Sequence, residues 1–211
     1  MNPVLTATVV HDLKNALGVL VGELAGLESA AGEGPLERQA VHAHTVARQL
    51  SAKLVAFLTL YRVSSSGLTL QTRDHNAEDF LRDLATGLVL PADAPSVAVT
   101  IDEELPPFWF FDAYLTGLAL EAAVQNAVRF AHSRITLSAR MRNGFLLFLV
   151  QDDGPGLGAQ GAPSTGLGTE LCRAIAHSHK DGGRTGKVVL KNVQPEGSLE
   201  SQGARFELWL P

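Results

Sequence analysis

Apolar residues recur at helical spacing through the N-terminal part of the chain. They step by fours and threes through Leu13, Leu17, Leu20, Leu24, Leu27 and Ala31, and again through Ala43, Ala47, Leu50, Leu54, Phe57 and Tyr61. Gly32–Pro35 separates the two series, because glycine interrupts helices and proline fits a first helical turn. The pattern predicts one helix from about Pro3 to Ala31 and a second beginning at Pro35.

Two such helices joined by a short turn form an antiparallel hairpin with more apolar surface than one hairpin can cover. Pairing two copies into a four-helix bundle buries both apolar stripes, so we expect a homodimer. The alternative is that the hairpin packs on the rest of its own chain. Ser64–Gly67 is expected to be a linker, which divides the chain into residues 1–63 and residues 68–211.

Beyond the linker, short alternating segments and helical segments succeed one another. We expect an α+β fold, an open mixed sheet with helices on one face. The expected strands are 68–71, 97–101, 134–141, 145–151, 187–193 and 204–210, with a short aromatic run at 108–111; the expected helices are 77–88, 168–179 and one that Asp112 caps and that reaches about 131.

Composition narrows the possible partners. The formal net charge of −5, without a basic stripe, argues against nucleic acid as a partner. The single cysteine, Cys172, excludes a disulfide framework and favours a cytoplasmic location. No signal peptide is expected, and the longest apolar runs are too short to span a membrane. Input to a signalling role would then come from a separate sensor or upstream protein.

His11 lies beside Asp12, and Asn15 follows one helical turn later. Residues four apart share a helix face, so His11 and Asn15 project together. An imidazole next to a carboxylate is a plausible nucleophile for a phosphoryl group, because the carboxylate can orient the ring and take up its proton. The alternative is a solvated histidine without chemistry, and the second half of the chain favours the chemical interpretation.

Asn126 and Arg129 lie one turn apart on the helix that Asp112 is expected to cap. An amide oxygen and a guanidinium on one face can meet a triphosphate and its Mg²⁺. Phe130, the next residue, can flank the base or its ribose. This helix is therefore a candidate for one wall of a nucleotide site.

Two glycine-containing segments complete that candidate site. Asp152 follows a predicted strand, where its carboxylate can accept the exocyclic amine of adenine, while Gly154 and Gly156 let the backbone approach the base. Gly166 and Gly168 open a helix, whose free N–H groups form an anion site. Their order along the chain, on a helix, at a strand end and at a helix start, favours a nucleotide site.

The C-terminal domain resembles the ATPase module shared by histidine kinases, gyrase and Hsp90-type proteins. The N box, G1 box and G2 box of that family are matched by Asn126, by Asp152 with Gly154 and Gly156, and by Gly166 with Gly168. The segment His11–Asn15 resembles the H box of the dimerisation and phosphoacceptor hairpin. The resemblance implies a dimeric four-helix bundle followed by an α/β-sandwich of the histidine kinase ATPase type.

The resemblance also implies a function, that of a protein-histidine kinase in a two-component phosphorelay. ATP and Mg²⁺ are the implied cofactors, with Asn126 as the metal-binding residue. His11 would carry the phosphoryl group, Asp12 would act as its base, and Asn15 would assist dephosphorylation of a partner. The implied partner is the receiver domain of a response regulator, whose aspartate accepts the phosphoryl group.

Three positions depart from the family pattern. Ala16 stands where the family commonly has proline, and Ala122 replaces the first asparagine of the N box. The segment Leu157–Thr165, between the G1 and G2 boxes, is short and contains no aromatic or charged residue. Phosphoryl transfer depends on cations near the γ-phosphate. Two alternatives therefore stay open: an ATP-independent histidine phosphotransferase with a degenerate ATPase domain, and a non-catalytic ATP-binding regulatory dimer.

Overall fold

The computed structural model of the chain describes residues 3–30, 34–90, 94–101, 105–158, 166–193 and 203–211; the side chains of residues 3–12, 14, 28, 30, 35, 37 and 66 lie outside the description. The chain divides into two compact units, Met1–Ser65 and Ser66–Pro211. Within the described ranges, no helix is both long enough and apolar enough to cross a bilayer.

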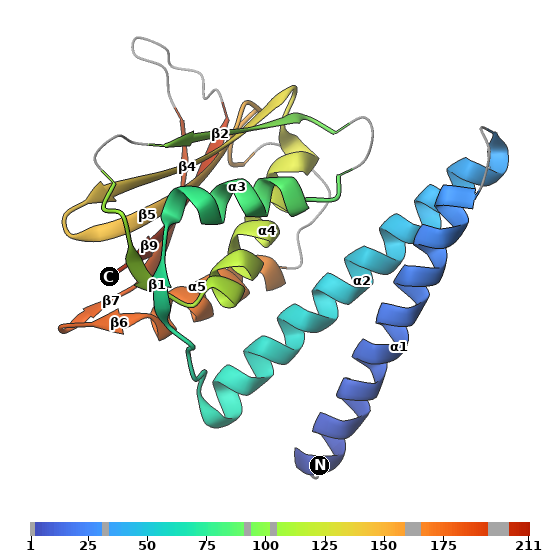
Figure 1. Cartoon of the computed structure of the whole chain (residues 1–211), viewed down its shortest axis with the longest axis horizontal. Coiled ribbons are helices and arrows are strands. Elements are labelled where there is room, and N and C mark those ends of the chain that lie inside the picture. The colour runs from blue at the N-terminus through green and yellow to red at the C-terminus, as the bar shows by residue number, and fades with distance from the viewer. Residues whose placement is uncertain (1–2, 31–33, 91–93, 102–104, 159–165, 194–202) are drawn as a thin grey trace. The chain divides into compact units, whose positions relative to one another are not determined.

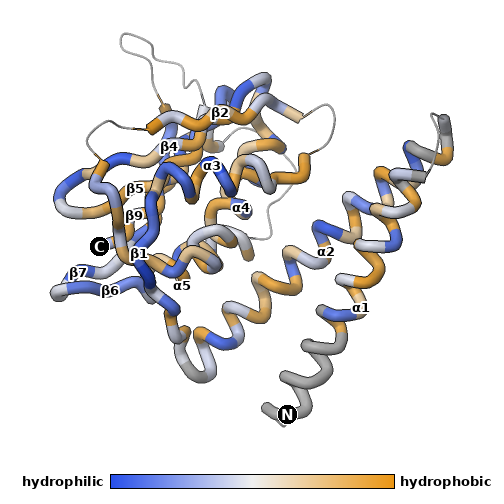
Figure 2. The backbone as a smooth tube through the Cα atoms, viewed as in Figure 1, coloured by the Kyte–Doolittle hydropathy of each residue, from blue (hydrophilic) through white to orange (hydrophobic). Residues whose placement is uncertain are grey.

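The first unit consists of two long helices, α1 (Pro3–Ala30) and α2 (Pro35–Ser66), as the apolar spacing predicts. Figure 2 shows hydrophobic positions recurring along the length of α2 between hydrophilic ones. Ala47, Ala56 and Thr59 of α2 are buried.

Part of the apolar pattern of this hairpin faces solvent. Residues spaced by multiples of seven are between 44% and 69% exposed: Leu13, Leu20 and Leu27 on α1, and Leu36, Leu50 and Phe57 on α2. A heptad spacing keeps side chains on one side of a helix. We call these six residues the exposed heptad row.

The second helix continues beyond its expected end. Ser64 and Ser65, expected in the linker, belong to the last turn of α2. Their hydroxyls donate to the carbonyl oxygens of Tyr61 (2.9 Å) and Arg62 (3.4 Å). Serine hydroxyls can bond within the preceding turn in this way, which lets a serine run remain helical. Gly67, with a φ of 77°, follows the helix directly.

The second unit is built on a five-stranded mixed sheet, as expected. Its strands lie in the order β2 (Ser96–Ile101), β4 (Arg134–Arg142), β5 (Phe145–Asp152), β9 (Ala204–Leu210) and β8 (Lys187–Asn192). β2 runs parallel to β4, and every other neighbouring pair is antiparallel.

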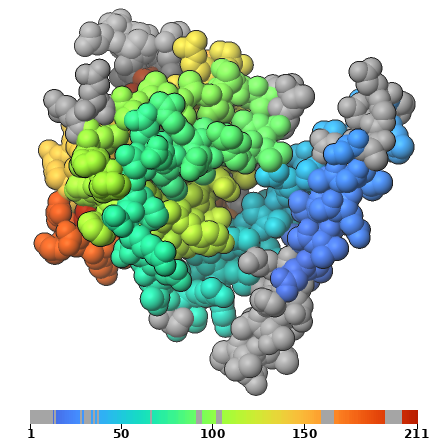
Figure 3. Space-filling view, viewed as in Figure 1, coloured from blue at the N-terminus to red at the C-terminus, as the bar shows by residue number. Residues whose placement is uncertain are grey.

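Three helices cover one face of this sheet: α3 (Ala77–Gly87), α4 (Ala113–Phe130) and α5 (Leu167–Ser178) (Figure 1). Alternate strand residues face these helices and are fully buried, among them Ile135, Phe148 and Leu208. Figure 3 shows the side chains of α3 and α4 closing over the sheet. The core of the unit lies between this helix layer and the sheet.

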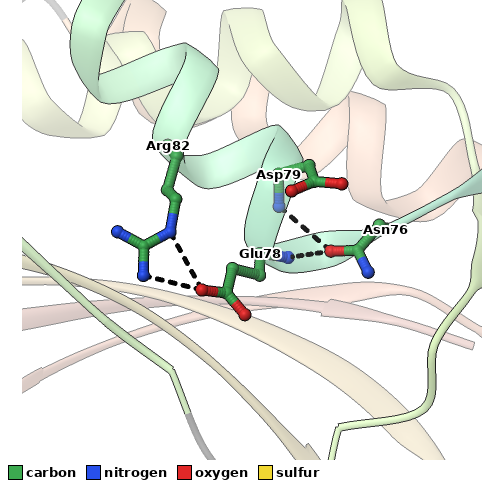
Figure 4. Close-up of polar contacts among 4 residues, drawn as sticks. All are labelled: Asn76, Glu78, Asp79 and Arg82. Atoms are coloured by element: carbon green, nitrogen blue, oxygen red, sulfur yellow. Dashed lines mark hydrogen bonds and ion pairs between the residues drawn. The ribbon is translucent and has the colours of Figure 1, made fainter.

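Asn76 sets the beginning of α3 (Figure 4). Its side-chain oxygen accepts hydrogen bonds from the backbone N–H groups of Glu78 (2.9 Å) and Asp79 (3.0 Å), which satisfies donors that the first helical turn leaves open. One turn further, Arg82 pairs with Glu78 at 2.6 Å. The exposed helix is therefore well stabilised at its N-terminus.

Two small strand pairs flank the main sheet. β1 (Arg73–His75) pairs with β3 (Trp109–Phe111), and β6 (Lys180–Asp181) pairs with β7 (Arg184–Thr185). The expected strand at 68–71 is wrong. The N–H of Gln71 donates to the carboxylate of Asp112 (2.7 Å) instead of to a neighbouring strand.

Candidate functional site

The candidate phosphoacceptor segment lies within α1. His11 and Asp12 are helical, and their side chains fall outside the described part of the chain. Asn15, one turn beyond His11, is exposed. The helix therefore places the backbone of His11 and of Asn15 on one face, as the spacing predicts.

Asp112 fixes the beginning of α4, the helix that carries Asn126, Arg129 and Phe130. One carboxylate oxygen of Asp112 accepts the N–H of Leu115 (2.9 Å), which is the predicted cap, and the other accepts the N–H of Gln71. Asp112 is only 5% exposed, so this carboxylate is committed to holding the helix start in place.

His179 is 2% exposed and links α4 to α5. Its Nε2 accepts the backbone N–H of Asp112 (3.1 Å), and its Nδ1 bonds the carbonyl of Ile175 (2.9 Å). Burial lowers the pKa of the imidazole, although the bond to Ile175 and the charge of Asp112 oppose that effect. The ring is therefore neutral, with Nδ1 as donor and Nε2 as acceptor.

The N-box and G2-box candidates meet. A Cβ atom placed on Gly168 would lie 3.8 Å from the side-chain nitrogen of Asn126 and 3.8 Å from the Cβ of Ala122. The first turn of α5 thus lies against the middle of α4, with Asn126 at the contact. The positive N-terminal end of α5 and an amide side chain are brought to one place, as an anion–metal pair requires.

Asp152 ends β5 and is 7% exposed. Its Oδ1 accepts hydrogen bonds from the N–H groups of Gly154 (2.9 Å) and Ala204 (3.2 Å). Among the described residues, none donates to the other oxygen, Oδ2. The carboxylate is thus held through one oxygen while the second keeps its capacity to accept, which fits a site for an exocyclic amine.

Gly154 packs against the end of α4. A Cβ atom at this position would collide with the backbone carbonyl of Phe130 and lie 3.0 Å from Asp152 Oδ1. The G1-box loop can therefore approach the end of the N-box helix only with glycine here. The guanidinium of Arg129 lies over the ring of Phe130, 5.5 Å from its centroid.

Gly156 and Gly166 have positive φ angles of 84° and 71°. L-residues with a side chain rarely adopt this region, so glycine is required at both positions. Gly166 is the N-cap of α5 and supplies no side chain to its N-terminal amides. The amides of the first turn can then bind an anion. Most of the segment Leu157–Thr165, residues 159–165, lies outside the described residues.

Asp153, which was not predicted as a site residue from the sequence, holds the same loop in place. Its carboxylate accepts the hydroxyl of Ser133 (2.6 Å) and the N–H groups of Ser133 (3.0 Å) and His132 (2.9 Å). Desolvation raises the pKa of Asp153, but these hydrogen bonds outweigh it and hold the pKa well below its usual range. The two neighbouring aspartates therefore have different roles. Asp152 faces the helices, and Asp153 fixes the turn before β4.

A cleft of about 560 Å³ lies at the same end of the sheet. Its lining includes Arg134, Thr136 and Gln151, which alternate with the buried, helix-facing residues Ile135 and Val150. The cleft thus opens on the face of the sheet that carries no helices. Asp152 and Gly154 also line the cleft, which therefore adjoins the G1-box loop.

No group of three or more His, Cys, Asp or Glu side chains in the described ranges could hold a metal ion. Mg²⁺ usually keeps several waters and binds substrate phosphates besides one or two protein ligands. Asn126 is the candidate for such a ligand.

Comparisons with known proteins find similar sequences and similar folds. The family model "Histidine kinase-, DNA gyrase B-, and HSP90-like ATPase" matches residues 112–211. The sensor protein KdpD of Escherichia coli (strain K12) is 28% identical over 230 residues, which cover 98% of this chain and 24% of the relative. The chain thus spans about a quarter of that curated relative's length.

Solved structures share the fold. Full-length ShkA in complex with AMPPNP matches with a TM-score of 0.66 at 20% identity, covering 100% of this chain and 46% of that one. The Acinetobacter baumannii histidine kinase AdeS matches with a TM-score of 0.58 at 19% identity, covering 95% of this chain and 96% of that one. The ATPase-type match over residues 112–211 and these similar proteins support a histidine kinase-type GHKL ATPase fold for the second unit.

Proposed function

We propose that this chain is a histidine kinase of a two-component phosphorelay, which binds Mg-ATP and phosphorylates His11. The main support is the contact between Asn126 and Gly168, because it brings an amide side chain next to the N-terminal end of α5, where an anion can bind. The complex of ShkA with AMPPNP supports the nucleotide part. The match to KdpD over 98% of this chain supports the kinase part.

Each group at the site then has a role. Asp152 accepts the exocyclic amine of adenine, and the loop through Gly154 and Gly156 lies against the base. The backbone amides in the first turn of α5, next to Gly166 and Gly168, bind phosphate oxygens. Asn126 supplies the protein ligand for Mg²⁺. Bound ATP would provide the phosphoryl group, and Arg129 the positive charge near it.

On α1, the imidazole of His11 attacks the γ-phosphorus as its bond to the leaving oxygen of ADP breaks. Asp12 orients the ring and takes up its proton. The phosphoryl group passes next to an aspartate on the receiver domain of a response regulator, and Asn15 assists its later hydrolysis from that partner. A separate sensor would supply the input, and the cytoplasm is the proposed location.

The exposed heptad row supports a homodimer. Six apolar side chains, each at least 44% exposed, lie at heptad spacing on the two helices. Burying such a row is favourable by roughly 25 cal/mol for each Å² removed from water. A second hairpin of this chain completes a four-helix bundle around it.

A second candidate function follows from the segment Leu157–Thr165, which carries no charged side chain. Arg129 then remains the cation offered to the γ-phosphate. A protein that binds ATP without transferring its phosphoryl group, or that accepts phosphate at His11 from a regulator, would tolerate this segment.

Incubation with γ-labelled ATP tests the proposal in the wild type, His11→Gln, Asp152→Asn and the control His42→Gln, an exposed residue of α2. We expect acid-labile label on the wild type and on His42→Gln, and none on His11→Gln. Asp152→Asn should bind ATP at least about tenfold more weakly in calorimetry, because an amide replaces the acceptor carboxylate.

Other outcomes separate the alternatives. ATP binding without label would replace the kinase by a regulatory ATP-binding dimer. Absence of ATP binding, with label taken up from a phosphorylated receiver domain, would establish the phosphotransferase. Label that persists in His11→Gln would place the phosphoacceptor elsewhere.

A further inference from the structure

The face of the sheet that carries no helices has an unusual distribution of charge. The residues of β4, β5, β9 and β8 that alternate with the helix-facing core lie on it, and their register brings them into rows. The cationic members are Arg134, Arg140 and Arg142 on β4, Arg205 on β9, and Lys187 and Lys191 on β8, with Arg184 of β7 at the edge. We call these seven residues the cationic face.

An apolar cluster lies beneath these cations. Leu147, Leu149 and Trp209 are at most 7% exposed, and Phe145 and Val189 pack against them. The ammonium of Lys187 lies 4.4 Å from the centroid of the Trp209 ring, and the guanidinium of Arg184 lies 5.4 Å from that of Phe145. The long side chains thus cover the apolar cluster with their stems and present their charges outward.

Few carboxylates balance these charges. Glu207 pairs with Lys191 at 2.6 Å and is ionised, since the bond and charge of Lys191 lower its pKa more than burial raises it. Asp181 pairs with Arg184 at 3.1 Å. The charge of Arg140 also lowers the pKa of Glu207. The other four cations have no carboxylate within ion-pair distance in the described part of the chain. The whole chain, by contrast, holds 22 acidic and 17 basic residues.

The cationic face ends at the cleft behind the G1-box loop. Arg134 and Gln151 line this cleft, and the guanidinium of Arg205 donates to the side-chain oxygen of Gln151 (2.6 Å). Asp153 also borders the cleft, but its carboxylate already accepts donors from Ser133 and His132. The cationic face is thus a positively charged surface that borders a cleft at one end.

We propose that the cationic face is a docking surface for an acidic patch on a partner protein. Four cations without a carboxylate partner in the described residues, all on the sheet face that carries no helices, supply the complementary charge. A membrane or a nucleic acid is a less suitable occupant, because an extended polyanion also meets the excess negative charge of the rest of the chain. A compact acidic patch avoids that repulsion, since charges beyond a Debye length of about 8 Å are screened.

A fluorescently labelled poly-glutamate peptide, short enough to contact the cationic face alone, is titrated into the full chain at low salt as the probe. The test variant is Arg142→Glu/Lys187→Glu, in which both exposed residues belong to the cationic face. The control is Arg82→Glu/Arg173→Glu, which changes the net charge equally on α3 and α5, where both arginines are more than 50% exposed. We expect the test variant to bind at least about tenfold more weakly than the control variant.

A second readout locates the binding. In a Trp109→Phe background, Trp209 is the remaining tryptophan. Its emission should shift on addition of poly-glutamate, because an anion that recruits Lys187 withdraws the ammonium from the ring. Equal weakening by the two double variants, or unchanged Trp209 emission, would overturn the proposal. Tighter binding of phosphatidylserine vesicles or duplex DNA than of poly-glutamate would replace the acidic protein by a membrane or a nucleic acid.

Discussion

At the scale of single residues, Gly154 imposes the tightest steric limit on the candidate site. A methyl group there would meet the carbonyl of Phe130, which is backbone and cannot rotate away. We expect Gly154→Ala to lower the free energy of unfolding by about 1–3 kcal/mol, the usual range for overpacking. It should also weaken ATP binding, since the G1-box loop must move.

Gly117, inside α4, is the matched control. A Cβ atom there meets nothing within 4 Å, and the residue is helical. Gly117→Ala should therefore raise the free energy of unfolding by about 0.5–1 kcal/mol. Urea denaturation of both variants measures the difference, and equal effects would contradict the steric explanation.

Asp153 should make stability depend on pH. Its pKa is lowered in the native state, so ionised Asp153 stabilises the fold above the unfolded-state pKa of about 3.9. That contribution is lost as the pH falls toward the native pKa. The difference in unfolding free energy between the wild type and Asp153→Asn should therefore shrink below about pH 4. Asp83→Asn, at an exposed position, should show no such trend.

Sequence reasoning reached some residues of the site and not others. Gly154 and Gly168 belong to short spaced motifs, and the contacts that they make need only backbone and one neighbouring side chain. Asp153 and His179 act through partners 20 or more positions away, such as Ser133 and Asp112. Such pairing depends on how strands and helices pack, so no local pattern reveals it.

At the scale of elements, His179 joins the start of α4 to the end of α5. Protonation would turn Nε2 into a donor, and it could then no longer accept the N–H of Asp112. Because burial lowers the pKa of the imidazole, the unfolded state binds the proton first as the pH falls. Stability should therefore decrease below about pH 6.5.

Thermal unfolding between neutral and mildly acidic pH measures this effect. His179→Phe should remove the pH dependence in that range while lowering stability throughout. His177→Gln, at an exposed position in the same helix, is the matched control and should leave the dependence unchanged. The same slope in His179→Phe as in the wild type would assign it to another group.

Long periodic elements were predictable, and short ones were not. α4 begins at the predicted cap, and β9 has the predicted bounds. The segment 68–71 alternates like a strand, yet Gln71 bonds a side chain, which no pattern indicates. Gly182 and Gly183 could have indicated the hairpin of β6 and β7. Their φ angles are 52° and 79°. Two glycines between short strands are typical of such turns.

At the scale of the whole molecule, the exposed heptad row should determine the oligomeric state. Leu50→Glu places a charge within the row and should raise the dimer dissociation constant at least about tenfold, because burying an unpaired carboxylate is costly. Gln49→Glu adds the same charge at the neighbouring exposed position, outside the row. Sedimentation equilibrium of the two variants is the measurement. Equal dissociation constants would show that the row is not the interface.

The bond between Gln71 and Asp112 ties the beginning of the second unit to the start of α4. Only a few residues separate the last turn of α2 from Gln71, and the carboxylate that holds Gln71 also sets the first turn of α4. Through His179, the same aspartate is tied to α5. The start of α4 and the end of α5 therefore share one anchor, so a displacement of Asp112 would disturb both helices of the candidate site at once.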